Sequence, residues 1–129
     1  MIFAIAMTLA PINYAALLHS IAQVESGNNW DIRGGALQWT ETAWKEETKC
    51  MSFTLAMHKP TAMILANIRL HRMAARLNSE GIRPTAYALA LTWHFGYDGA
   101  KERLTLLEKN EYGERVQNLY DEIEKEPKL

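Results

Sequence analysis

One carboxylate occupies a position where the pattern of the chain predicts an apolar side chain. From Tyr14 to Ser26, apolar residues recur at steps of three and four, which is typical of an amphipathic helix. At 100° per residue, Glu25 lies within about 20° of Tyr14, near the centre of the apolar stripe. Burial and the negative end of the helix dipole both favour the protonated carboxyl group there. Such a group could protonate a glycosidic oxygen, or it could be a buried acid paired with an arginine or with backbone amides.

Further helices are expected after this first helix, separated from it and from one another by loops. Thr40 can cap a second helix, and Pro60 can open a long one that continues to about Ser79. Residues 85–95 are apolar almost all round, which predicts a central buried helix, and 96–99 should form a loop. Two charged segments follow from Lys101. We therefore expect one all-α domain with little or no sheet.

The composition excludes several classes of protein. The 129 residues carry 14 Lys and Arg against 15 Asp and Glu, a formal net charge of −1, and 48% are hydrophobic. These values are ordinary for a globular domain, and they lack the basic surplus of a nucleic-acid binder. The single cysteine, Cys50, cannot form an intramolecular disulfide, and no zinc-ligand spacing is present. We expect no metal, no cofactor and a monomer.

The first residues form a separate apolar segment. Met1 to Ala10 are apolar, but no Lys or Arg precedes them and the run is too short to span a bilayer. Residues 1–13 are interpreted as a signal remnant or a packed extension, and residues 14–129 as the helical domain. No integral membrane span is expected.

Several short stretches, taken in order, resemble one family. Ile21 to Gly27 reads IAQVESG, 34–40 reads GGALQWT and 88–99 reads ALALTWHFGYDG. Together with 112–120, YGERVQNLY, they resemble the soluble lytic transglycosylases and goose-type lysozymes. That family has a helix ending in Glu-Ser, a Gly/Ala loop leading to Gln, an Ala-Leu-Ala-Ala-Tyr-Asn-Ala-Gly helix and a closing Tyr-Val helix. The resemblance implies a lysozyme-like fold.

The resemblance also implies a reaction and its catalytic residues. The substrate would be peptidoglycan glycan strands, cut at the β-1,4 bond between N-acetylmuramic acid and N-acetylglucosamine. Glu25 would act as the general acid and then as the base. Asp31 is the candidate for positioning a water if hydrolysis is the outcome, although a loop aspartate also commonly forms an Asx-turn. The protein would then be periplasmic or extracellular, of bacterial or phage origin.

Candidate substrate-binding residues follow from the same motifs. Gln38 would hydrogen-bond an N-acetyl group or orient Glu25, and Ser26 accompanies Glu25 at the end of the helix. The aromatic residues of the loops would stack on sugar faces; they are Trp30, Trp39 and Tyr97. Trp93 and His94 stand where the family has Tyr and Asn. Core packing is an equal expectation for Trp93, and for His94 a core position is the stronger one.

Two other functions stay open. The Trp93-His94 pair departs from the family, so the chain could be a peptidoglycan-binding module without catalysis, or a helical interaction protein that shares only the periodicity. Arg69, Arg72 and Arg76 recur along one helical face, within a segment, 58–83, that has five basic residues and one acidic residue. This stripe could bind an anionic glycan, but pairing with the acidic C-terminal helices is the stronger expectation.

Overall fold

The computed structural model describes residues 11–127, and in this range the chain is entirely helical. The α-helices are α1 (Tyr14–Ser26), α2 (Glu41–Thr48), α3 (Lys59–Ser79), α4 (Ala86–Leu106) and α5 (Glu111–Lys125), with a short 3-10 helix, η1 (Phe53–Met57). The all-α prediction is confirmed for this range. Most of the predicted N-terminal segment, residues 1–10, lies outside it, so its interpretation stays a prediction.

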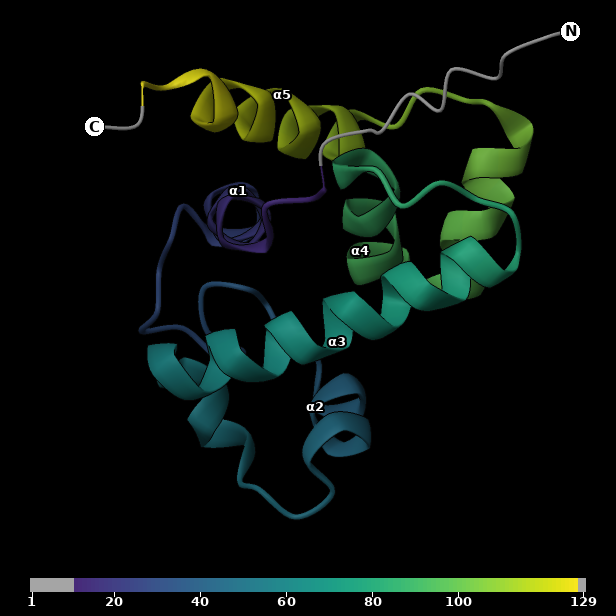
Figure 1. Ribbon diagram of the computed structural model, residues 1–129. Helices are drawn as coiled ribbons and strands as arrows, with labels where there is room; N and C mark the ends of the chain where they lie inside the picture. Colours follow the sequence, from purple (N-terminus) through teal and green to yellow (C-terminus); the bar gives the residue numbers. More distant parts are fainter. Residues whose placement is uncertain (1–10, 128–129) are drawn as a thin grey trace, which may run out of the picture.

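The helices pack around α1. In Figure 1, α5 crosses above α1, which is seen end-on, while α3 passes in front and α2 lies below α3. Helix α1 contacts both α5 and α3, and α4 also contacts both of them. Fully buried apolar side chains fill the space between these helices; among the largest are Leu17, Ile21, Leu37, Trp44, Leu70, Leu77, Leu89 and Leu91. One face of α1 is therefore buried against α3 and α5, while Ala15, His19 and Gln23 on its other face are exposed.

Helix α1 has the bounds that the sequence predicts. The Asn13 side chain accepts a hydrogen bond from the Ala16 amide at the start of the helix. At the other end Gly27 adopts a left-handed conformation, and its amide bonds to carbonyl groups of the last turn. The helix predicted from Tyr14 to Ser26 is confirmed. This fixes Glu25 in the final turn.

The predicted loop at 96–99 is wrong. Only Gly96 leaves the helical conformation, with φ 79° and ψ 169°, and α4 resumes at the next residue and continues to Leu106. Glycine tolerates this positive φ, so a kink replaces the loop. Helix α4 therefore has two segments, with Trp93 and His94 just before the kink and Tyr97 just after it.

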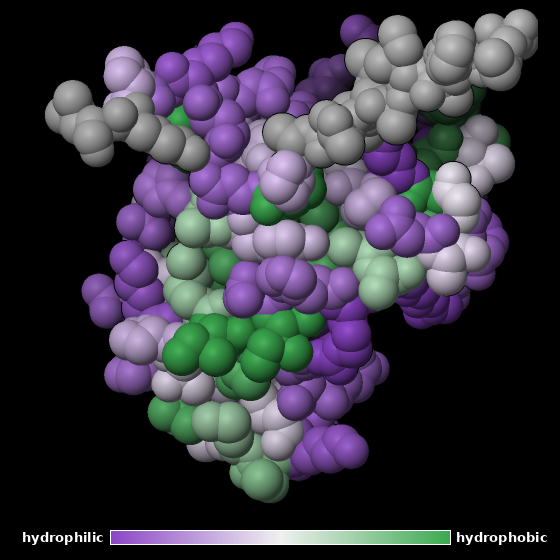
Figure 2. Space-filling view, in the orientation of Figure 1, coloured by the Kyte–Doolittle hydropathy of each residue, from purple (hydrophilic) through white to green (hydrophobic). Residues whose placement is uncertain are grey.

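The face of α3 away from the core is partly apolar. Figure 2 shows an apolar patch over the first half of this helix, where Ile64 and Ile68 are exposed. No helix within residues 11–127 combines the length and the apolar character needed to cross a membrane.

The loop from Gly27 to Thr40 depends on two adjacent glycines. Gly34 and Gly35 both have positive φ, 85° and 68°. A Cβ atom at Gly35 would overlap the backbone carbonyl of Ala56, so the loop can lie against η1 only if this residue has no side chain.

We therefore expect Gly35→Ala to lower the free energy of unfolding by more than about 2 kcal/mol, from strain and overlap together. Gly27→Ala is the matched control, because Gly27 has a similar φ of 67° but open space around it. It should lose only about 1 kcal/mol. Urea denaturation of both variants measures the difference, and equal losses would show that the overlap with Ala56 contributes nothing.

Candidate functional site

Glu25 lies where α1, α4 and α5 meet. Its side chain is only 10% exposed. Oε2 lies 2.9 Å from Nδ1 of His94 on α4, and it accepts a hydrogen bond of 2.8 Å from the Tyr112 hydroxyl on α5. No arginine pairs with the carboxyl group among the described residues. The carboxyl group is therefore held by two groups that are 69 and 87 residues away in the sequence.

His94 is not a core histidine. Its side chain is 40% exposed, and its ring stacks on Tyr112 with the ring centroids 4.2 Å apart. This stacking directs Nδ1 toward Glu25, while the exposed part of the ring borders a pocket. The stronger sequence expectation, a satisfied core residue, is wrong.

Tyr112 is a site residue that sequence reasoning missed. Burial first, and then the charge and hydrogen bond of Glu25, raise the pKa of Tyr112 far above its usual value, so the phenol remains a donor to the carboxylate. The next residue, Gly113, lies so close to α4 that a Cβ atom there would be 2.6 Å from the Tyr87 ring. The signal that could have identified Tyr112 is its place at the start of the stretch that resembles the Tyr-Val helix.

Trp93 connects α4 to the loop before α2. Its Nε1 donates a hydrogen bond of 3.0 Å to the Leu37 carbonyl. Trp93 also packs edge-on against Trp39, which packs edge-on against Trp44. Trp39 is only 4% exposed, so the expected sugar-stacking surface is wrong for this residue. Trp93 is half-buried and lines the pocket, so it combines the two roles expected for it.

Ser26 and Gln38 hydrogen-bond the loop between α1 and α2 rather than the carboxyl group of Glu25. The Ser26 hydroxyl lies 2.8 Å from the Ala36 carbonyl and accepts a hydrogen bond from the Asn29 amide. Nε2 of Gln38 donates to the carbonyls of Arg33 and Gly35. The structure thus gives Gln38 no part in orienting Glu25, a task that Tyr112 and His94 perform.

Asp31 and Trp30 occupy the outer part of the same loop. Asp31 is exposed, and its amide bonds to the Asn29 side chain, so the Asx-turn forms two residues earlier than expected. The Asp31 carboxylate is not among the hydrogen-bond partners of Glu25. Trp30 packs half-buried against the core, and its Nε1 has no partner among the described residues. The roles expected for these two residues therefore stay predictions.

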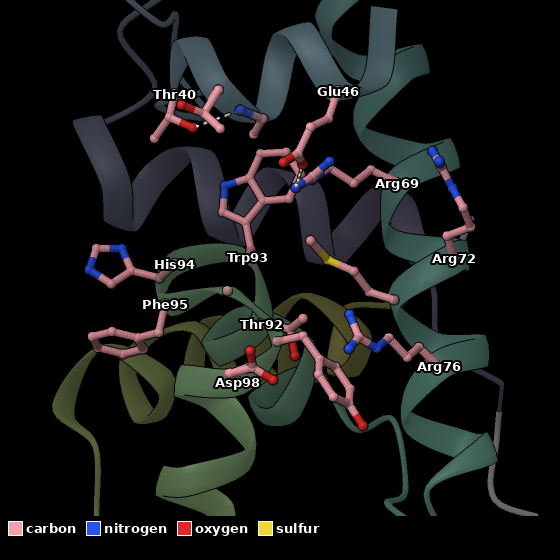
Figure 3. Close-up of a pocket in the computed structure, with 15 residues that line it drawn as sticks. Thr40, Glu46, Arg69, Arg72, Arg76, Thr92, Trp93, His94, Phe95 and Asp98 are labelled. Carbon is pink, nitrogen blue, oxygen red and sulfur yellow. Dashed lines mark hydrogen bonds and ion pairs between the residues drawn. The ribbon is translucent and has the colours of Figure 1, made fainter.

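A pocket of about 760 Å³ lies beside His94, between α2, α3 and α4. Figure 3 shows Trp93 in its centre, with His94 and Arg76 on opposite sides of the view. Tyr97 also lines it, and its ring lies 3.5 Å from the Arg76 guanidinium carbon. The lining comes from Thr40, Thr42, Ala43 and Glu46, from Arg69, Arg72, Met73 and Arg76, and from residues 92–98.

The arginine stripe of α3 forms one wall of this pocket. Arg69 pairs with Glu46 and Glu47 of α2, and Arg72 pairs with Glu47. The expected pairing with the C-terminal helices is wrong, because these arginines face α2 across the pocket. No group of three or more His, Cys, Asp or Glu side chains between residues 11 and 127 could hold a metal ion.

The buried phenol of Tyr112 should make stability depend on alkaline pH. The pKa of Tyr112 is raised in the folded state, so its contribution is complete below the unfolded-state pKa of about 10 and is lost above it. We expect the difference in unfolding free energy between the wild type and Tyr112→Phe to fall by about 1.4 kcal/mol per pH unit above pH 10. Denaturant unfolding between pH 8 and 11 measures it. A difference that does not change with pH would contradict the buried, carboxylate-bonded phenol.

Comparisons of the chain with protein-family models, curated proteins and solved structures found no match. The observations that bear on function are therefore its helical fold and the side chains gathered around Glu25.

Proposed function

We propose that this protein is a glycosidase that cleaves the β-1,4 glycan of peptidoglycan, with Glu25 as the general acid and base. The observation that carries the proposal is the nearly buried carboxyl group of Glu25, which is held by Tyr112 and by His94, a residue that lines the pocket. The proposal places the protein in the periplasm or outside the cell, where its substrate lies.

The hydrogen bonds leave one oxygen of Glu25 available for proton transfer. Both partners bind Oε2, and no hydrogen bond among the described residues uses Oε1. With the Glu25 proton on Oε1 and a proton on Nδ1 of His94, Oε2 accepts two hydrogen bonds. Oε1 can then protonate the leaving oxygen of the glycosidic bond. The two donors remain to stabilise the carboxylate that forms, so their geometry suits the step in which charge develops.

In the second step the Oε1 carboxylate oxygen takes a proton back. If that proton comes from water, the product is a reducing sugar; if it comes from the 6-hydroxyl group of the muramic acid, the product is an anhydro sugar. The half-buried Trp93 offers an apolar edge to a sugar in the pocket.

The convergence of the motifs supports catalysis over the alternatives. Four stretches resemble the family in sequence order, and four contacts bring them together. These contacts join Ser26 with Ala36, Trp93 with Leu37, Glu25 with His94, and Glu25 with Tyr112. A helical interaction protein that shared only the periodicity would have no reason to place these stretches together. A binding module without catalysis would still need the pocket, but it would not need the carboxyl group.

Replacing the acid should separate these functions. We expect Glu25→Gln to reduce the release of soluble muropeptides from purified sacculi by about 10²- to 10⁴-fold, because the amide cannot donate the required proton. Glu41→Gln is the matched control: Glu41 is exposed and pairs with Arg33, so activity should not change. Unchanged release by Glu25→Gln would refute the catalytic assignment. Binding to sacculi without release by the wild type would indicate a binding module.

A further inference from the structure

The charges of the pocket beside His94 are mostly paired, with one exception on the arginine wall. Arg69 and Arg72 are engaged by Glu46 and Glu47, and the Glu47 carboxylate is only 2% exposed. These two guanidinium groups are therefore fixed between α2 and α3. Arg76 makes no ion pair with any residue between 11 and 127.

The Arg76 guanidinium is held in place by an aromatic ring. Its central carbon lies 3.5 Å from the centroid of the Tyr97 ring, and both side chains line the pocket. A stacked guanidinium keeps its hydrogen-bond donors in its own plane, where they can bind a planar oxyanion in a bidentate manner. Because the contact with Tyr97 orders the side chain in advance, a ligand would lose less entropy in binding to it.

Among the described residues that line the pocket, the acidic side chain besides Glu46 is that of Asp98. It lines the pocket, and it makes no ion pair among the described residues. Like-charge repulsion from Asp98 should weaken an anion bound at Arg76. Removing the positive charge of Arg76 should therefore weaken anion binding, whereas removing the negative charge of Asp98 should strengthen it.

We propose that Arg76 and Tyr97 form a subsite for a carboxylate carried by the glycan. This inference rests on the proposed function and narrows its substrate. The lactyl-linked peptide of N-acetylmuramic acid carries free carboxylates, whereas polymers of N-acetylglucosamine alone carry none. The subsite lies across the pocket from His94, the partner of Glu25, with Trp93 between them (Figure 3). In this proposal the sugar lies against Trp93, and its carboxylate substituent points toward Arg76.

The test uses binding, which does not depend on cleavage. The probes are N-acetylmuramyl-L-alanyl-D-isoglutamine, which has a free carboxylate, and the same molecule with that carboxylate converted to an amide. Binding to the wild type is measured by calorimetry or by NMR titration. We expect the carboxylate form to bind about 3- to 10-fold more tightly, as suits a charge-assisted hydrogen bond at a partly exposed site.

Three variants assign that preference to the subsite. Arg76→Gln should abolish it and leave binding of the amide form unchanged, and Arg76→Lys should retain only part of it because a lysine cannot bind in a bidentate manner. Asp98→Asn should increase it. Arg83→Gln is the matched control, because Arg83 is exposed in the loop between α3 and α4 and does not line the pocket.

The outcomes separate this inference from the proposed function. If Arg76→Gln keeps the full preference, or if it weakens both probes equally, the subsite is refuted even where Glu25→Gln abolishes cleavage. If the preference depends on Arg76 but no cleavage occurs, the subsite stands and the catalytic assignment fails. Circular dichroism and thermal unfolding of each variant show whether it is folded before binding is compared.

Discussion

The arrangement of α1, α4 and α5 depends on one constraint. The carboxyl group of Glu25 is almost out of contact with water, so it must be hydrogen-bonded by protein groups. Removing such a group from water is unfavourable unless hydrogen bonds replace its hydration. At Glu25 the replacements come from α4 and α5, so these helices must meet at the end of α1. The stacking of His94 on Tyr112 joins the two partners to each other. Packing of the core and hydrogen bonding of the Glu25 carboxyl group therefore require the same arrangement of helices.

The loop before α2 is fixed in a different way. Its carbonyl groups at Arg33, Gly35, Ala36 and Leu37 are all bonded by side chains, and the donors come from α1, from α4 and from the loop itself. The family resemblance assigns Ser26, Gln38 and Trp93 to substrate binding, but here these side chains hydrogen-bond the loop backbone. The part of the site that remains open to a ligand is formed instead by α3 and the middle of α4.

Local features of this protein could be predicted from sequence, whereas distant contacts could not. The caps at Asn13 and Thr40 and the helix from Pro60 act within a few residues, so composition and spacing reveal them. Glu25 was identifiable because a charge in an apolar stripe is itself a local signal. Its partner Tyr112 is 87 residues away, and the packing of α5 against α1 and α4 brings it near.

The errors at Trp39 and Gly96 have similar physical causes. Trp39 and Tyr97 occupy equivalent positions in the sequence pattern, each an aromatic residue beside a loop or a glycine. One is enclosed by two other tryptophans and the other is covered by an arginine, and both neighbours come from other elements. At Gly96 the sequence indicates a break but not its length, because a single glycine can either end a helix or redirect it.

The conformation of Gly96 determines one dimension of the pocket. His94 belongs to the segment of α4 before the kink, and Tyr97 to the segment after it. Two backbone torsions at one residue therefore set the spacing between His94, the partner of Glu25, and Tyr97, the ring that covers Arg76. A change in those torsions would alter the distance between the two ends of the pocket without requiring a change in the hydrogen bonds of Glu25. The size of the pocket and the surroundings of the carboxyl group are in this sense structurally independent, although a single helix carries residues for both.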